Sequence, residues 1–476
     1  MSRSSSPTLS LLDVNENWLS PETTPAGGAA EYFRLSGTPS PTTVSGSCVS
    51  QGYFSYEGIT CYGRAATVIP SLEFGDLPAV AADDDSSQLP FAVEEVVRNL
   101  REERYQAPAD GMAGRSPGSE FVRSAYYAAR PLLPVMVRRH LQKFRLRGWQ
   151  DIPFPSWPVD FSVDRLLERA LIAEMRARNV SELPFVWFWP DGARSAVMMT
   201  HDVEGSVGRQ FADELMDIDD AAEIKAAFQI IPEGHHRHSV GLMERMRSRG
   251  FEVNVHDFNH DGELFRSRER FLRRAPLINN YAREMGCRGF RSGALYREQS
   301  WLVDLDFAYD MSVPNVAHLE PQRGGCCTVM PYFVGNVLEL PLTTAQDYSL
   351  FHILDDYSID IWKRQLNLIL RWHGLISFNV HPDYVSEPRA KAVYLQLLAH
   401  LSSLREQENL WVARPGEIER WWRSRSQMAV VSRAGAWMIE GPDSSRARCA
   451  WAKLRGHSVE YHVEVATRRC AEAATA

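Results

Sequence analysis

Short apolar runs alternate with longer amphipathic runs through the central half of the chain. Seven apolar runs have the length and composition of buried strands: SAVMMTHDV, AAFQIIP, FEVNVH, CRGFRSG, VLELPLT, LISFNVHP and NLWVARP. Helical patterns separate several of them, over residues 240–249, 262–286 and 358–373, and each ends at or just before a glycine. This alternation predicts a parallel sheet covered by helices, in a closed or nearly closed β/α barrel.

The remaining segments suggest additions to this barrel. Residues 1–90 are rich in Ser, Thr, Pro and Gly and predict an arm that is poorly ordered or only partly packed. Four aromatic residues in the arm indicate that part of it lies on the main body, namely Tyr53, Phe54, Tyr56 and Tyr62. The expected division is therefore an arm over 1–90, a helical extension over 91–160, a barrel over 161–425 and a small β appendage over 426–476.

Charge and composition exclude some partners. The 476 residues are 44% hydrophobic and 24% charged, as in an ordinary globular protein. The net charge of −8 argues against nucleic acid as a partner, because binding to phosphates requires positive charge. The basic stretch 121–149 has apolar faces and is interrupted by Pro131 and Pro134. We expect it to dock as a helix pair on the next domain, with contact to a membrane surface as the alternative. No protein partner is evident.

Cysteine usage and the first residues bear on the compartment. The seven cysteines are odd in number and contain no CxxC spacing, which argues against a disulfide framework and a thiolate zinc site. MSRSSSPTLS lacks the apolar segment of a secretory signal, and no stretch has the length of a membrane-spanning helix. These features predict a cytoplasmic protein.

Polar, chemically active side chains follow four of the predicted strands. In β/α barrels the catalytic groups gather where the strands end. The residues concerned are Asp202 and Glu204 after the first strand, His256 and His260 after the third, Arg291 after the fourth and His381 after the sixth. We therefore expect all six to surround one site.

The types of these residues indicate metal chemistry. His256 and His260 are four residues apart, which on a helical turn would place both imidazoles on one face, close enough to share one ion. Asp202 or Glu204 supplies a carboxylate. Two histidines and one carboxylate are typical of a hydrolytic zinc site or a related divalent site. The second carboxylate would remain available as a general base. Spacing alone does not decide which acid has which role.

The order of these motifs resembles that of the polysaccharide deacetylase family, the metal-dependent carbohydrate esterases, over about residues 190–425. THDVEG is similar to a Thr-His-Asp-Val-Asp/Glu variant of the family's first motif, and HDFNH matches its His-(Ser/Thr)-x-x-His motif. The resemblance implies a distorted barrel of seven or eight β/α units. It also implies a divalent metal, with zinc expected, held by Glu204, His256 and His260, and Asp202 as the catalytic base.

Three further motifs carry the resemblance. RSGAL retains Arg291, which would orient the base through a bidentate contact, but it lacks the family's proline. YDMSVP is similar to a groove-wall motif and includes Asp310 and Pro314. FNVH approximates the last motif and makes His381 the candidate general acid. Because one residue separates the two acids in DVE, the roles of Asp202 and Glu204 could also be exchanged.

The expected function is removal of an N-acetyl or similar acyl group from a sugar, oligosaccharide or glycan precursor, here an intermediate made inside the cell. Hydrolysis of a non-sugar amide and non-catalytic glycan binding are the alternatives.

Several conspicuous residues are left outside the site. Packing is the expected role for Cys326, Cys327, Trp421 and Trp422, and a solvated loop is expected for His235, His236 and His238. Glu339 needs a partner because it lies within an apolar strand, and a place in the substrate pocket remains open for it.

Overall fold

A nine-stranded sheet forms the centre of the computed structural model, which describes residues 28–37, 50–81, 86–106, 143–144, 146–233 and 240–464. Its strands are β5 (Ser195–Val203), β6 (Ala227–Ile230), β7 (Glu252–His256), β8 (Gly289–Arg291), β9 (Tyr309–Asp310), β10 (Tyr332–Val334), β11 (Val337–Glu339), β12 (Leu375–Asn379) and β13 (Leu410–Val412). The order is β10-β11-β9-β8-β7-β6-β5-β12, and β13 also pairs with β5. All neighbours are parallel except β10 and β11.

Burial on both faces explains why the strands read as apolar runs. All nine residues of β5 are buried, as expected for a parallel strand covered on each side. The covering helices are α6 (Ser206–Ala221), α7 (Val240–Ser248), α8 (Arg268–Met285), α9 (Asp360–Arg371), α10 (Pro382–Val385), α11 (Pro388–Glu408) and α12 (Pro415–Ser426). Leu215 of α6, Trp362 of α9 and Leu397 of α11 belong to one core cluster with the strands. The sequence therefore predicted the α/β class and the parallel sheet.

The sheet is curled, but its ends are not joined by a strand ladder in the described part of the chain. β12 lies at one end of the strand order and β10 at the other. The hydroxyl of Thr343 donates to the Leu375 carbonyl and that of Thr344 donates to the Ser377 carbonyl, both at 2.8 Å. These side-chain bonds tie the chain after β11 to β12. The result is an incomplete barrel instead of a fully hydrogen-bonded one.

Helix α8 begins later than the sequence predicts, and a loop that contains His260 precedes it. The pattern predicted a helix from residue 262, but α8 begins at Arg268, where the Ser267 side chain accepts a hydrogen bond from the Arg270 N–H. The preceding loop contains Asp257 and His260 in the left-handed region, both with φ of 56°. These conformations exclude a helical turn over 256–260, and Gly262, with φ of 70°, has a left-handed conformation at the predicted start of the helix. Helix α8 ends at Gly286, as predicted, with φ of 61°.

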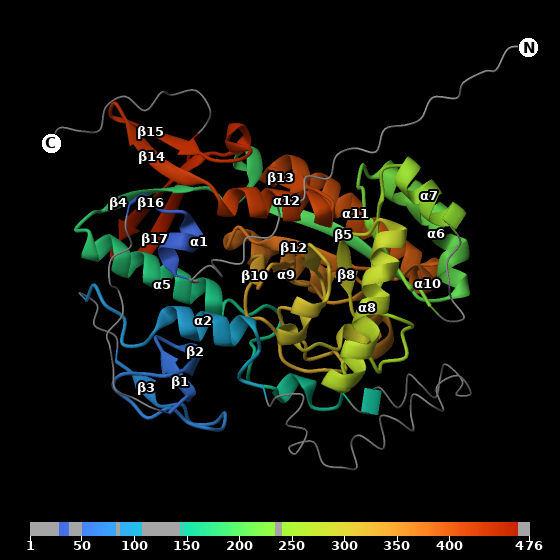
Figure 1. Ribbon diagram of the computed structural model, residues 1–476, viewed down its shortest axis with the longest axis horizontal. Helices are drawn as coiled ribbons and strands as arrows, with labels where there is room; N and C mark the ends of the chain where they lie inside the picture. Colours follow the sequence, from blue (N-terminus) through green and yellow to red (C-terminus); the bar gives the residue numbers. More distant parts are fainter. Residues whose placement is uncertain are drawn as a thin grey trace, which may run out of the picture.

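The chain before the barrel contains more regular structure than its composition predicts. A three-stranded sheet is formed by β1 (Gly52–Tyr56), β2 (Ile59–Gly63) and β3 (Ala79–Val80), and it lies beside α2 (Val93–Arg101) and α5 (Ser162–Ala177). In Figure 1, α1 (Ala29–Phe33) lies on the other side of α5. Phe54 is fully buried against Phe91. Glu103 forms a buried ion pair with Arg297 at 2.5 Å, which attaches this region to the barrel. Most of 121–149 lies outside the described residues.

The C-terminal strands also connect to the body. Strands β14 (Ala429–Arg433) and β15 (Ala436–Glu440) form a hairpin, whereas β16 (Cys449–Arg455) pairs with both β17 (Ser458–Val463) and β4 (Glu182–Val186). The β content expected for 426–476 is present, but β16 shares a sheet with a strand from within the expected barrel range. Trp421 and Trp422 are buried in the same core cluster as Ala450 and Ala452 of β16, so both have the packing role predicted for them. Among the described helices, none is long and apolar enough to cross a membrane.

Candidate metal and hydrolase site

The six residues singled out in the sequence meet at the carboxyl ends of four strands. Asp202 lies at the end of β5, and Glu204 follows it directly. His256 ends β7, Arg291 ends β8 and His381 follows β12 by two residues. These strands are close neighbours in the sheet order, so their ends open onto one place. The parallel arrangement is what brings residues from positions 202 to 381 together.

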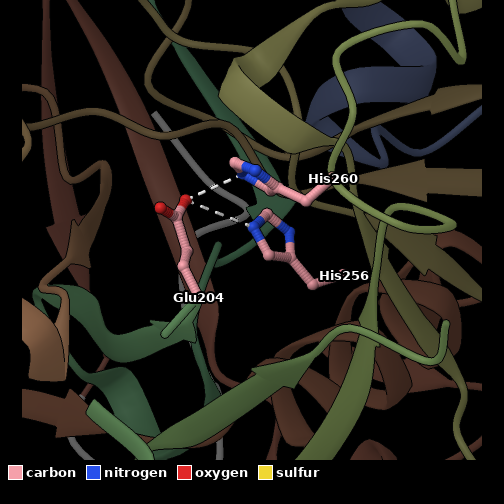
Figure 2. Close-up of side chains that lie close together, drawn as sticks. All are labelled: Glu204, His256 and His260. Carbon is pink, nitrogen blue, oxygen red and sulfur yellow. Dashed lines mark ion pairs between the residues drawn. The ribbon is translucent and has the colours of Figure 1, made fainter. Parts of the chain in front are cut away.

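Glu204, His256 and His260 form a group that fits a metal ion. One ligand atom from each lies within 4.8 Å of the others. Figure 2 shows the Glu204 carboxylate facing both imidazole rings, with Oε1 at 2.9 Å from His260 Nε2 and 3.6 Å from His256 Nε2. Two imidazole nitrogens and a carboxylate oxygen are the donor set of many hydrolytic zinc sites.

The hydrogen bond made by the His256 ring supports the same interpretation. Its Nδ1 lies 3.1 Å from the carbonyl oxygen of Arg291 and can only donate there. The proton of a neutral ring therefore sits on Nδ1, and the lone pair of Nε2 faces Glu204. That Nε2 is buried and has no hydrogen-bond partner. A buried nitrogen with a free lone pair is what a bound cation would require.

Asp202 is held by two donors, one on each carboxylate oxygen. Arg291 Nη1 donates to Oδ1 at 2.9 Å, and Asn379 Nδ2 donates to Oδ2 at 2.8 Å. The sequence predicted a bidentate contact between Arg291 and Asp202, but only Nη1 donates to the carboxylate. Nε of the same guanidinium donates to the Met311 carbonyl instead. Burial raises the pKa of Asp202, but nearby positive charge, above all that of Arg291, outweighs burial and holds the pKa below the usual value. Asp202 is thus ionised and oriented.

Asp347 holds His381 in place. Its Oδ1 lies 2.7 Å from Nδ1 of the ring, and its Oδ2 accepts from the His381 backbone N–H at 2.8 Å. The other ring nitrogen, Nε2, faces the site at 3.8 Å from both Asp202 Oδ2 and Glu204 Oε1. Burial lowers the pKa of His381, but Asp347 and the site carboxylates outweigh it and raise the pKa to about 10. A protonated His381 can therefore donate a proton at neutral pH.

Sequence analysis did not identify Asp347 and Asn379, which hold the candidate acid and base, or Gln346, which bonds to Asn379. Asp347 and Asn379 touch the catalytic candidates directly, while Gln346 accepts from Asn379 at 2.8 Å and donates to Glu320 at 2.6 Å. Asn379 could have been noticed, since it stands two residues before His381 at a strand end. Asp347 lies in a segment without a strand pattern, and nothing in AQDYS marks it.

The remaining polar residues near the strands have structural partners. His201 points away from Asp202, as strand alternation requires, and its Nε2 lies 2.9 Å from the buried Asp219. Glu339 of β11 is in register with Asp310 of β9, and it accepts from the Val313 N–H. Burial and Asp310 together hold the pKa of Glu339 well above its usual range. Cys326 and Cys327 are fully buried free thiols, and the histidines at 235, 236 and 238 lie outside the described residues.

Comparisons with known proteins give only a distant similarity. No family model matches the chain, and no curated protein matches it. Several similar solved structures are polysaccharide or peptidoglycan deacetylases. A protein from Mycobacterium smegmatis assigned as a polysaccharide deacetylase is 19% identical, with a TM-score of 0.42 over 50% of this chain and 93% of its own. The peptidoglycan deacetylase PdaC from Bacillus subtilis is 10% identical, with a TM-score of 0.32 over 49% and 93%.

An enzyme of another activity is similar to the same extent. The allantoinase PuuE is 14% identical, with a TM-score of 0.39 over 49% of this chain and 92% of its own. None of these TM-scores reaches 0.5, so neither the fold nor the function of the chain is inferred from them.

Proposed function

We propose that the protein is a metal-dependent hydrolase that removes an N-acetyl or similar acyl group from a sugar, an oligosaccharide or a glycan precursor. The observation that carries the proposal is the group of Glu204, His256 and His260 beside an ionised Asp202 and a protonated His381. This combination contains a cation site, a base and an acid within one set of strand ends. Amide hydrolysis needs all three.

A divalent cation, with zinc expected, would be held by Glu204, His256 and His260, where it would supply Lewis acidity for a carbonyl oxygen and for water. Asp202 takes the proton of the attacking water as the carbon–oxygen bond forms. Its Oδ2 lies 3.8 Å from His381 Nε2, so base and acid face the same reacting group. His381 then protonates the nitrogen as the carbon–nitrogen bond breaks. Positioned acid and base groups typically contribute ~10²–10⁴-fold each in rate.

Aromatic rings beside His381 favour a sugar over a simple amide. Tyr384 packs against the His381 ring with centroids 5.1 Å apart, and Tyr348 packs against Tyr384 at 5.4 Å. Both tyrosines are only partly buried. Binding sites commonly combine aromatic walls with a few oriented polar groups. Partly exposed rings offer a flat apolar surface that matches the C–H face of a pyranose.

The test combines metal content with acetate release. Purified protein is analysed for metals beside the His256→Ala/His260→Ala double variant, and both are assayed on N-acetylglucosamine oligomers and on simple amides. We expect about one equivalent of divalent metal in the unaltered protein, its loss in the variant, and acetate release from the oligomers only. Turnover of simple amides alone would support the other hydrolase function. Bound metal with no turnover of either substrate would support non-catalytic glycan binding.

A further inference from the structure

Asp383 joins the two chain segments that carry Glu204 and His381. It lies in α10, two residues after His381, and its carboxylate crosses to the beginning of α6. Oδ2 accepts from the backbone N–H groups of Glu204 at 3.3 Å and Gly205 at 3.1 Å, and Oδ1 accepts from Gly208 at 3.0 Å. A carboxylate at the N-terminus of a helix is favoured by the unpaired N–H groups and the helix dipole there.

Two glycines make room for this carboxylate. A Cβ atom added at Gly205 would overlap Oδ1 of Asp383, and one added at Gly208 would overlap Oδ2. Gly205 has a φ of −128°, which any residue can adopt, so it is the space that requires glycine there. Gly208 lies inside α6, where alanine is normally the more favourable residue. The sequence thus has glycine at both positions where a Cβ would displace Asp383, and at Gly208 this choice lowers helix propensity.

The contact continues the pairing of β5 with β12 beyond the strands. The ladder ends with Thr200 opposite Asn379, after which the Val380 N–H donates to the Thr200 carbonyl at 3.0 Å. Glu204 is one residue past the end of β5, and its backbone N–H bonds to Asp383. The position of the Glu204 backbone, and hence the reach of its side chain toward His256 and His260, therefore depends on Asp383.

We infer that Asp383 is a positioning residue for the metal ligand Glu204, and that Gly205 and Gly208 are part of the same device. This inference rests on the proposed function, because it assumes that Glu204 binds a metal. Asp383 touches neither the reacting atoms nor the metal. It acts by fixing the backbone from which Glu204 projects, as groups behind the ligands do at other metal sites.

Metal affinity provides the direct test. The dissociation constant for Zn²⁺ is measured by competition with a chromophoric chelator for the full chain and for Asp383→Ala. We expect the variant to bind Zn²⁺ about 10–100-fold more weakly, the usual effect of removing such a group. Asp383→Asn, which keeps one acceptor oxygen, should lie between the two. Equal affinity in all three proteins would overturn the inference and leave the proposed function standing.

A substitution on the other side of the contact separates positioning from general stability. Gly205→Ala should weaken Zn²⁺ binding because its Cβ displaces the Asp383 carboxylate. It should have no further effect in the Asp383→Ala background, because the nearest atoms around that Cβ all belong to the Asp383 side chain. Gly241→Ala in α7 is the control, since a Cβ there has only Arg245 Nη1 within reach, at 4.0 Å. Additive effects, or a silent Gly205→Ala, would contradict the inference. A full chain that binds no Zn²⁺ would overturn both the inference and the proposed function.

Discussion

Asp347 binds His381 twice, through the ring Nδ1 at 2.7 Å and through the backbone N–H at 2.8 Å. The two residues are separated by α9 and β12 in the sequence, and both are buried. One carboxylate therefore fixes the backbone and the ring orientation of the candidate acid and also favours its charged form. This arrangement turns a histidine near a strand end into a group that remains protonated at neutral pH.

Removing the charge of Asp347 should move the pH dependence of the reaction. His381 must be protonated to act as an acid, so activity falls as the pH rises through its pKa. Asp347→Asn removes the largest favourable interaction with the charged ring, and the pKa of His381 drops below about 10. We expect the alkaline limb of the kcat/KM profile to shift to lower pH, with kcat reduced by ~10²-fold or more. Asp355→Asn, at an exposed left-handed position, is the control. An unmoved alkaline limb would show that His381 is not the acid.

The roles of the two acids can be separated by metal content. Asp202→Asn should keep about one equivalent of metal and lose turnover by ~10²–10⁴-fold, because it removes the base but leaves the ligands. Glu204→Gln should lose the metal, because Glu204 Oε1 is the atom that faces both imidazoles. Elemental analysis and initial rates on the same preparations check both statements. The reverse pattern, metal lost with Asp202→Asn and kept with Glu204→Gln, would establish that the roles are exchanged.

Tyr348 tests the choice between a sugar and a simple amide. Tyr348→Leu removes the partly exposed ring, and we expect the KM for N-acetylglucosamine oligomers to rise by roughly tenfold, equivalent to about 1.4 kcal/mol of lost contact. Turnover of a small amide, if present, should not change, because such a substrate does not reach the ring. Tyr348→Phe keeps the aromatic face and should behave like the unaltered protein. If Phe and Leu at this position impair the oligomer reaction equally, the hydroxyl and not the ring is involved.

The sequence predicted which polar residues meet at the strand ends, but it predicted the elements around them less completely. Asp202, Glu204, His256 and Arg291 directly end or follow strands whose apolar runs are clear, and the parallel order places their ends together. Short elements were harder to detect: β9 has two residues and β10 three, too few to show a period. The start of α8 was placed too early because the left-handed conformation at Gly262 leaves no mark on hydrophobic spacing.

The long-range hydrogen bonds that hold the site residues could not be predicted in this way. Asp347, Asn379 and Asp383 act on residues 34, 177 and 178–179 positions away, respectively. Their partners are set by the register between β5 and β12 and by the path of the chain after β11. Composition and periodicity describe neighbours along the chain and along one element. Contacts of this kind become visible only when the strands are placed side by side.

Asp164 should make the stability of the fold depend on pH in the neutral range. Its side chain is buried in α5, where it accepts from the Thr328 hydroxyl at 2.8 Å and the Val329 N–H at 3.2 Å. Burial nevertheless outweighs these donors and raises the pKa of Asp164 from 3.8 to about 7. A folded-state pKa above the unfolded value means that the folded protein binds the extra proton. The free energy of unfolding should therefore fall as the pH rises from about 4 to 7.

Asp164→Asn mimics the protonated carboxyl at every pH, so it isolates this contribution from those of other buried acids. Urea unfolding at pH 5 and pH 8 gives the free energy of unfolding for the variant and for the unaltered protein. Relative to the unaltered protein, the variant should gain about 2–3 kcal/mol between pH 5 and pH 8, because only the roughly two pH units between pH 5 and the pKa of about 7 contribute. Asp306→Asn, at an exposed position, should show no such gain. A difference between variant and unaltered protein that is the same at both pH values would mean that Asp164 is ionised throughout, with its charge stabilised by Thr328 and Val329.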